Sequence, residues 1–374
     1  MSIYEEVLAF IQTPEPARFE LLALKVFRHQ FDTIAPYHQY CLDRGVHIDE
    51  VRSIDDIPPL STAAFKYAEL SDTVTPSEAA SARVFMTSGT TAGREERGRH
   101  RVPRTEVYRA SALGHLRRML FPDQTRMRML SMHPTADRMP ESSLGQMISW
   151  MFEEFGAGDS LCVADRKGVD IAPALEFLLS AESRSEAVCL IGTTAAFGAL
   201  FDELRARRLQ LSLSRGSRLM DTGGAKGQSV PLRPGQVVEQ TQILLGLDPA
   251  LVINEYGMTE MCSQMYDATW FNSRDSRGTA PGDERPEERS KLGPAWLDVA
   301  AVDPVNLQRV ADGHPGLLRF FDLANVGSVS AILTGDLGVI RDRAVRVLGR
   351  AEGGEARGCA LGIEQFASRE TREN

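Results

Sequence analysis

Apolar residues near the start of the chain recur at helical spacing. Residues 3–11 form an amphipathic segment, and residues 17–31 carry apolar side chains three and four positions apart. This period places the apolar side chains on one face of a helix, so both segments are predicted to be helical. Pro58 and Pro59 then interrupt the pattern, and a Ser or Thr after them is expected to cap a short helix that ends at Phe65.

After residue 83 the pattern changes to short apolar runs, each followed by a polar turn and an amphipathic segment. The expected strands are 84–86, 128–132, 160–164, 187–191, 218–220 and 251–255, and the expected helices are 105–120, 143–155, 171–179 and 195–207. This alternation predicts a layered α/β core with parallel strands. Ligands of such sheets bind beyond the carboxyl ends of the strands. The polar turns at 87–94, 192–194, 221–227 and 256–260 occupy that position.

The remaining segments are more polar. Residues 95–104 are strongly charged and are expected to form a loop, and residues 272–291 are expected to form a long mobile loop. Short apolar runs at 296–303, 316–321 and 328–333 predict a small β-rich lobe. We therefore predict one core over 1–340, followed by a short charged, Gly-rich tail over 341–374 with little to bury.

Composition excludes several classes of protein. The chain has 374 residues, of which 43% are hydrophobic and 25% charged, and its net charge is −9. A negative chain argues against a dedicated nucleic-acid or anionic-membrane binder. No apolar run approaches the roughly 18 residues of a membrane span, and no secretory signal is visible. The five cysteines form no C-x-x-C pair, which argues against a disulfide framework or a zinc site, so we expect a cytoplasmic protein.

The turn at 87–94 is a candidate phosphate loop. Its hydroxyl and glycine residues are Thr87, Ser88, Gly89, Thr90 and Thr91, and Arg94 follows. Glycine allows backbone N–H groups to approach anionic oxygens, the hydroxyls add donors, and Arg94 adds positive charge. The sequence is not a Walker loop, because G-x-x-x-x-G-K-[ST] is absent. An ordinary surface loop is the alternative.

A second motif spans 254–260 and turns at Gly257. The ring of Tyr256 can stack on a purine, and Thr259 can donate a hydrogen bond to a phosphate. Glu260 offers an oxygen ligand to Mg²⁺, which is usually shared with substrate phosphates. The alternative is a strand-to-helix turn capped by Thr259.

Two further glycine turns complete the set. Asp336 stands between two glycines, where its carboxylate can accept hydrogen bonds from a ribose diol. The alternative is a simple Gly-Asp turn. The turn at 221–227 contains Gly223, Gly224 and Ala225, whose backbone can wall an adenine ring or an acyl chain. A plain connection from strand to helix is equally compatible with it.

In this order, the motifs Thr-Ser-Gly-Thr-Thr, Gly-Gly-Ala, Tyr-Gly-Met-Thr-Glu and Thr-Gly-Asp-Leu-Gly resemble those of the adenylate-forming superfamily. That superfamily includes acyl-CoA ligases, adenylation domains of peptide synthetases and beetle luciferases. Within it the chain most resembles the acyl-protein synthetases of bacterial fatty acid reductase complexes. His133-Pro134, Asp221-Thr222-Gly223-Gly224 and Arg357-Gly358-Cys359 carry this closer resemblance.

The resemblance implies a role for each motif. It assigns Ser88 to Thr91 to the ATP phosphates, Gly223 to Ala225 and Tyr256 to adenine, Thr259 and Glu260 to the α-phosphate and the metal, and Asp336 to the ribose. Arg350 marks the junction to a C-terminal lobe, and the neighbouring Thr87 and Gly257 are also expected to bind the cofactor. Two departures stand out. Ala92 replaces the usual Gly, and the chain stops about where related ligases begin a C-terminal domain with a catalytic lysine. We therefore expect that domain to be truncated.

The reaction implied is ATP-dependent activation of a fatty or other carboxylic acid as an acyl adenylate. Mg²⁺, Arg94 and backbone N–H groups would neutralise the charge that builds on the phosphates. Family members carry an acyl-accepting cysteine near the C-terminus, which corresponds to Cys359. Arg357 beside it favours the nucleophilic thiolate. The alternative for Cys359 is an unreactive tail thiol.

Several questions stay open from the sequence. His133 either lines the acyl pocket and orients the carboxylate or is a structural histidine before Pro134. The methionines between 127 and 151 suit an acyl pocket or a helix core, and Cys262 is expected in the core or a site wall. The final acceptor is expected to be a protein such as a reductase or a carrier protein. Rival functions are ligation to coenzyme A or a carrier-protein pantetheine, and a non-catalytic subunit that stabilises a reductase.

Overall fold

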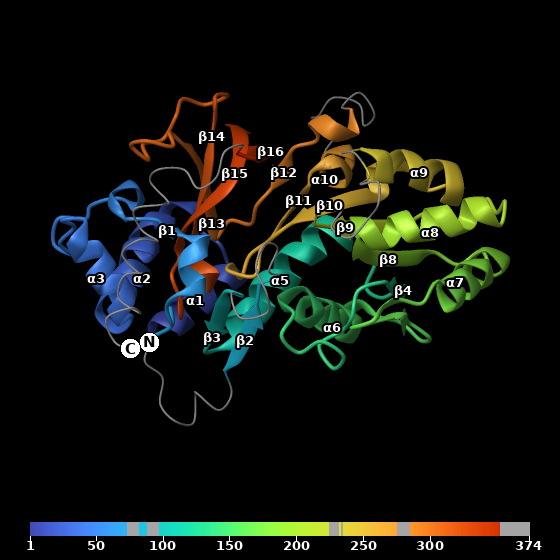
Figure 1. The fold of residues 1–374 in the computed structure, drawn as a ribbon, viewed down its shortest axis with the longest axis horizontal. Coiled ribbons are helices and arrows are strands. Elements are labelled where there is room, and N and C mark those ends of the chain that lie inside the picture. Colours follow the sequence, from blue (N-terminus) through green and yellow to red (C-terminus); the bar gives the residue numbers. More distant parts are fainter. Residues whose placement is uncertain (73–81, 88–96, 224–231, 233–234, 275–284, 352–374) are drawn as a thin grey trace. The chain divides into compact units, whose positions relative to one another are not determined.

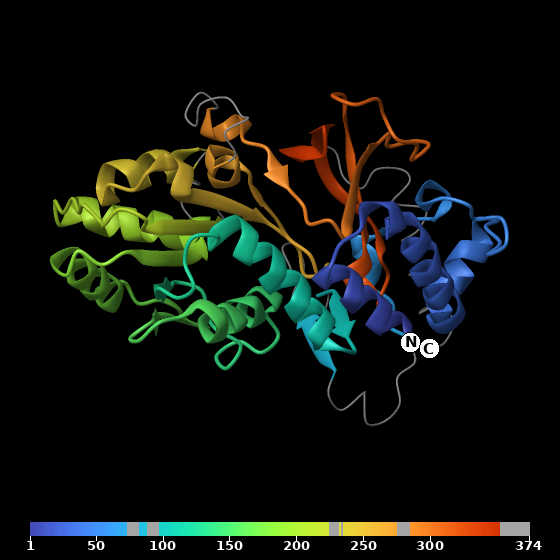
Figure 2. The same ribbon diagram turned by 180° about the vertical axis from the view of Figure 1, so that it is seen from behind.

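The computed structural model describes residues 1–72, 82–87, 97–223, 232, 235–274 and 285–351. The chain divides into two compact units (Figures 1 and 2). Unit 1 comprises Met1–Gly114, Met258–Gln264 and Leu292–Asn374, and unit 2 comprises His115–Gly257 and Met265–Lys291. Each unit brings together segments that lie far apart in the sequence.

Unit 2 is built on a mainly parallel sheet. Its strands, in chain order, are β4 (Arg128–Ser131), β5 (Leu161–Cys162), β8 (Val188–Thr193), β9 (Arg218–Thr222), β10 (Val252–Tyr256) and β11 (Met265–Asp267). They lie side by side in the order β5-β4-β8-β9-β10-β11. The first five are parallel, and β11 runs antiparallel to β10. The predicted parallel α/β core is therefore confirmed.

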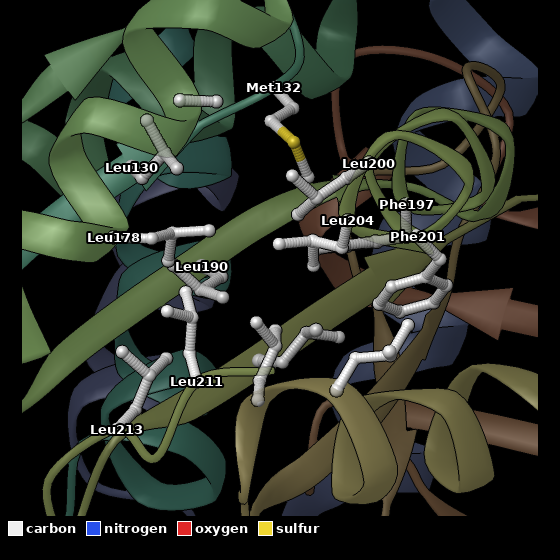
Figure 3. Packing of buried hydrophobic residues seen from close by; sticks show 14 of the residues in the cluster. Leu130, Met132, Leu178, Leu190, Phe197, Leu200, Phe201, Leu204, Leu211 and Leu213 are labelled. Carbon is white, nitrogen blue, oxygen red and sulfur yellow. The ribbon is translucent and has the colours of Figure 1, made fainter. Parts of the chain in front are cut away.

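Helices cover both faces of this sheet. They are α5 (Thr105–Leu120), which begins in unit 1, α6 (Ser143–Phe155), α7 (Ile171–Ser183), α8 (Thr194–Ala206), α9 (Gln236–Leu245) and α10 (Thr269–Arg274). One apolar cluster joins α7, α8 and α9 to the sheet, and it includes Leu190 of β8, Leu178 of α7 and Phe201 of α8 (Figure 3). On β9, Leu219 joins this cluster, whereas its neighbour Arg218 donates to the carbonyl of Leu120 at the end of α5. Because neighbouring strand residues point to opposite faces, both faces are covered.

The polar residues after the strands also start the helices. Ser142 accepts a hydrogen bond from the N–H of Gly145 at the start of α6, and Asp170 accepts one at the start of α7. Thr193 ends β8 and caps α8. Each side chain satisfies a backbone donor that the first helical turn leaves free, which explains why Ser, Asp and Thr stand at these boundaries. A short hairpin, β6 (Ala164–Asp165) with β7 (Gly168–Val169), precedes α7.

Unit 1 combines N-terminal helices with antiparallel strands. The helices are α1 (Ile3–Gln12), α2 (Phe19–Thr33) and α3 (Ala35–Asp43), with 3₁₀ turns η1 (Pro16–Arg18), η2 (Ile54–Asp56), η3 (Thr62–Lys66) and η7 (Leu323–Asn325). The strands are β1 (Leu60–Ser61), β2 (Arg83–Met86), β3 (Arg99–Val102), β13 (Leu297–Val302), β14 (Pro315–Asp322), β15 (Ala331–Arg341) and β16 (Ala344–Arg350). Strands β13 to β16 form an antiparallel meander, and β1 pairs in parallel with β15. This confirms the predicted β-rich region.

Two expectations about the segment around the candidate phosphate loop are wrong. Residues 95–104 do not form only a loop, because Arg99–Val102 is strand β3 and pairs with β2. Alternate residues of β3, His100 and Val102, are buried, and this period of two was hidden by the charged residues around them. Strands β2 and β3 also form a separate two-stranded sheet, so β2, the strand before the turn at 87–94, does not belong to the sheet of β8, β9 and β10.

The C-terminal third also departs from the expected loops. The described ends of the segment 272–291 belong to α10 and to η6 (Pro286–Glu288), followed by β12 (Lys291–Leu292). Arg289 and Lys291 are buried there. The stretch expected to have little to bury contains β16, which pairs along β15. The division of the chain at residue 340 stays a prediction. No helix among the described residues has both the length and the apolar character needed to cross a bilayer.

Candidate functional site

In unit 2, the carboxyl ends of three parallel strands place polar residues side by side. Gly192, Asp221 and Asn254 are aligned across β8, β9 and β10. The Asp221 carboxylate lies 2.9 Å from the Thr194 hydroxyl and accepts a hydrogen bond from the Asn254 amide at 3.0 Å. The sequence pattern predicted that these turns share a sheet edge, and the register confirms it for the three strands.

Lys291 ties Asn254 at this edge to Asp267. Its ammonium donates to the side-chain oxygen of Asn254 at 2.6 Å and to the carboxylate of Asp267 at 2.8 Å. All three side chains are at least partly buried, and Asp267 is 4% exposed. The ammonium also donates to the backbone carbonyl of Asn254 at 3.1 Å, so it has three oxygen partners. This arrangement fixes the orientation of Asn254, because rotating its amide would leave the buried ammonium short of an acceptor.

Two carboxyl groups of this cluster titrate near neutral pH. Burial raises the pKa of Glu255 to about 7, against a hydrogen bond from Thr222 and the charge of Lys291, which both lower it. Burial likewise raises the pKa of Asp221 to about 6. Perturbed carboxyl groups at the end of a parallel sheet are typical of functional sites. The sequence analysis assigned no role to Glu255; its only signal was an acidic residue inside an apolar strand.

The predicted adenine-contacting residues follow the same strands. Tyr256 ends β10 opposite Met265, and Gly257 comes next. Gly223 follows β9 with φ +75°, a conformation that favours glycine, and a Cβ added there meets no atom of the described residues within 4 Å. Gly224 and Ala225 lie outside the described residues.

His133 lies two residues beyond β4 and is held as a neutral imidazole. Its Nδ1–H donates to the carbonyl of Pro134 at 2.9 Å, and burial lowers its pKa. Ser131 fixes the backbone, because its hydroxyl donates to the His133 carbonyl at 2.7 Å. With Nδ1 protonated, Nε2 is the acceptor of the ring. A role in catalysis stays a prediction.

In unit 1, Glu260, Asp336 and Arg350 come together from distant parts of the chain. Asp336 on β15 is aligned with Arg350 on β16, and the Arg350 Nε lies 3.5 Å from the Asp336 carboxylate. Burial raises the pKa of Glu260 to about 7; the charges of Arg350 and Lys66 lower it, and that of Asp336 raises it. The structure thus places both predicted carboxylates within electrostatic range of each other.

Magnesium fits this arrangement. The described residues contain no group of three or more His, Cys, Asp and Glu side chains able to hold a metal ion. Mg²⁺ usually needs only one or two carboxylates, because substrate phosphates and water complete its coordination. A buried carboxyl group such as Glu260, whose ionisation is costly without a cation, suits a metal that arrives with a nucleotide.

Only the first residue of the candidate phosphate loop is described. The Thr87 hydroxyl accepts a hydrogen bond from the N–H of Gly98 at 2.8 Å, and its carbonyl accepts one from Arg97 Nε at 2.5 Å. Arg97, which the sequence analysis did not single out, therefore holds the end of β2. Ser88, Gly89, Thr90, Thr91 and Arg94 lie outside the described residues, as does Cys359.

Comparisons with known proteins agree with this picture. The family described as "Acyl-protein synthetase, LuxE" matches residues 12–367. The long-chain-fatty-acid–luciferin-component ligase of Aliivibrio fischeri is 21% identical over 382 residues, covering 98% of this chain and 95% of that protein. A structure of 2-hydroxyisobutyryl-CoA ligase with 2-HIB-AMP and CoA aligns with a TM-score of 0.62 at 16% identity, covering 90% of this chain and 71% of that one.

A second structure of 2-hydroxyisobutyryl-CoA ligase, in its thioesterification state, aligns with a TM-score of 0.60 at 15% identity and covers 91% of this chain and 70% of that one. At such low identity these two structures show a shared fold. The family match is stronger evidence of kinship than these structures, because it spans nearly the whole chain and includes the strand ends described above. The chain belongs to the acyl-protein synthetase family.

Proposed function

We propose that this protein activates a carboxylic acid with ATP and passes the acyl group to a protein thiol. The observation that carries the proposal is the family match over residues 12–367. The chain is accordingly an acid–thiol ligase. The name of its Aliivibrio fischeri relative points to a long-chain fatty acid as the substrate class.

The chemistry proceeds in two steps. A carboxylate oxygen of the acid attacks the α-phosphorus of ATP, and the bond to the β-phosphate oxygen breaks, releasing pyrophosphate. The resulting acyl adenylate is a mixed anhydride. A thiolate then attacks its acyl carbon, forming a thioester and releasing AMP. Activation is needed because a free carboxylate is a poor electrophile.

The residues of unit 1 suit the nucleotide's polar groups. Asp336 would accept hydrogen bonds from the ribose hydroxyls, and Thr259 would contact the α-phosphate. Glu260 would hold Mg²⁺, which when bound neutralises charge on the phosphates. Arg350 favours the ionised form of Glu260 and lies beside Asp336. Thr87 to Thr91 and Arg94 are proposed as the phosphate loop on sequence grounds.

The residues of unit 2 suit the base and the acid. The backbone at Gly223 and the ring of Tyr256 would contact adenine, with Gly224, Ala225 and Gly257 completing the turns. Asn254, held by Lys291, presents a fixed amide at the same strand ends. His133, whose Nδ1–H is used by the Pro134 carbonyl, would line the acyl pocket and orient the carboxylate through a water molecule that donates to its Nε2.

Cys359 is the proposed acyl acceptor within the chain. The final acceptor would be a second protein, such as a reductase or a carrier protein. Ligation to coenzyme A is the rival outcome. Acid-dependent exchange of labelled pyrophosphate into ATP, over a panel of straight-chain and aryl acids, tests the first step. No exchange with any acid would overturn the activation proposal and favour a non-catalytic subunit.

The second step needs a separate measurement. Incubation with ATP and the preferred acid, followed by mass spectrometry, should find the acyl group on Cys359 in the wild type and in Cys162→Ser, a matched control at another cysteine. Cys359→Ser should keep pyrophosphate exchange and lose the adduct. Acyl-CoA formation that persists in Cys359→Ser, with no protein adduct in the wild type, would contradict transfer to protein.

A further inference from the structure

The turn that carries Thr259 and Glu260 is held by two buried side chains of unit 1. The Nδ1–H of His100, on β3, donates to the carbonyl of Thr259 at 2.7 Å. The amide of Asn325, in η7, donates to the carbonyl of Glu260 at 2.8 Å. His100 and Asn325 are each 1% exposed. Two consecutive carbonyls are thus held by side chains that lie about 160 and 65 positions away in the sequence.

A third side chain fixes the next residues. The carboxylate of Asp322 accepts hydrogen bonds from the N–H of Cys262 at 3.0 Å and from the hydroxyl of Ser263 at 2.6 Å. The backbone on both sides of Met261 is therefore tied to β3 and to the start of η7. A clamped backbone leaves the Glu260 carboxylate few directions in which to point, which is the condition for precise ligand binding.

A small cavity lies against the same two side chains. Its volume, counted as the space open to the centre of a water-sized sphere, is about 10 Å³, and His100, Cys262 and Asn325 are among the residues that line it. Two buried atoms of these residues, His100 Nε2 and Asn325 Oδ1, have no hydrogen-bond partner in the described part of the chain. A cavity of about this size holds one water molecule.

The two unpaired atoms have matching chemistry. His100 donates through Nδ1, and burial lowers its pKa to about 4, so the ring is neutral and Nε2 is an acceptor. Asn325 uses its amide nitrogen as the donor to Glu260, so Oδ1 is also an acceptor. One water has two O–H donors and can satisfy both acceptors. Left unpaired, each buried acceptor would carry a desolvation penalty.

We propose that His100 and Asn325 are positioning residues that fix Thr259 and Glu260 for the nucleotide, and that one buried water donating to His100 Nε2 and Asn325 Oδ1 joins them. The inference rests on the proposed function, because it assigns a purpose to the fixed turn. Neither residue contacts the reacting atoms in this account. His100 acts through the backbone carbonyl of Thr259, and Asn325 acts through the backbone carbonyl of Glu260.

Two variants at one position separate positioning from folding. His100→Asn keeps a donor at the same number of bonds from Cβ as Nδ1, whereas His100→Gln moves the donor one bond further out. His100→Asn should keep kcat within about threefold of the wild type, and His100→Gln and Asn325→Leu should lower kcat/KM for ATP by about tenfold or more in pyrophosphate exchange. Titrating each variant with Mg²⁺ and a non-hydrolysable ATP analogue by calorimetry should show weaker binding in the same order.

Tyr37→Phe supplies the matched control. It removes another buried side-chain hydrogen bond of unit 1, from the Tyr37 hydroxyl to the carbonyl of Pro58, away from the clamped turn. This variant should lose thermal stability without losing nucleotide affinity. If His100→Gln and Asn325→Leu behave like Tyr37→Phe, with lowered Tm and unchanged nucleotide affinity and kcat, the positioning role is wrong.

The remaining outcomes are also informative. If the wild type binds the nucleotide and shows no acid-dependent exchange, the proposed function fails, and the calorimetric order of the variants still decides the positioning role. If the wild type binds no nucleotide at all, both fail. A crystal structure at high resolution should show one water within hydrogen-bond distance of His100 Nε2 and Asn325 Oδ1. A dry cavity would overturn the water bridge.

Discussion

Replacing Glu255 with Gln is expected to stabilise the protein at pH 8. Glu255 is 4% exposed and accepts a hydrogen bond from the Thr222 hydroxyl. Gln has nearly the same shape and keeps an oxygen that can accept this bond, so the variant removes the ionisation of the side chain and little else. Any change in the pH dependence of stability can then be assigned to this one group.

The size of the effect follows from the pKa. Burial raises the pKa of Glu255 from 4.5 to about 7. The folded protein therefore holds this proton more tightly than the unfolded chain, and between these two values the unfolded chain loses it first. Stability must fall as the pH rises through this window and level off above the folded pKa. At about 1.4 kcal/mol for each unit, the ionised Glu255 costs about 3 kcal/mol at pH 8.

Urea denaturation at pH 5, 6, 7 and 8, followed by tryptophan fluorescence, measures this difference. The difference in unfolding free energy between Glu255→Gln and the wild type should be small at pH 5. It should grow to about 3 kcal/mol at pH 8, with the variant the more stable protein. Glu176→Gln, at an exposed position of α7, is the control for the exchange of Glu for Gln outside the buried cluster. The reasoning would be refuted if the difference in unfolding free energy between Glu255→Gln and the wild type did not change with pH, or if the variant were less stable than the wild type at pH 8.

Three further predictions concern single side chains. Lys291→Met leaves the buried carboxylate of Asp267 without its close partner and should lower the unfolding free energy by about 3–5 kcal/mol in urea, and a loss under about 1 kcal/mol would contradict this. Asp336→Asn should raise the KM for ATP by about tenfold or more and leave Tm unchanged; the effect should vanish with 2′,3′-dideoxy-ATP, and its persistence would exclude ribose binding. Phe201→Ala, in the fully buried cluster of unit 2, should cost about 3–5 kcal/mol in urea, whereas Leu179→Ala, at a position 42% exposed, should cost under about 1 kcal/mol. Equal losses for these two would show that the cluster does not carry the stability of the unit.

Local patterns predicted much of the fold. The helix expected over 143–155 is α6, and the strands expected around 187–191 and 218–220 are β8 and β9. Hydrophobic period and capping residues act over a few neighbouring positions, so the sequence contains them in readable form. Strand β3 was missed because its arginines look solvated in the sequence. Only the pairing with β2 and the burial of His100 and Val102 make it a strand.

The sequence by itself determined which residue types carry the chemistry: an ordered set of glycine, hydroxyl and carboxylate motifs and the family to which they belong. Only the tertiary structure decided which of them meet. Asp336 and Arg350 are joined by strand register, the pKa of Glu255 and Glu260 is raised by burial, and the carbonyls of Thr259 and Glu260 are held by His100 and Asn325. The physical reason is that desolvation and hydrogen bonding depend on distances in space, and residues far apart along the chain reach those distances only when it is folded.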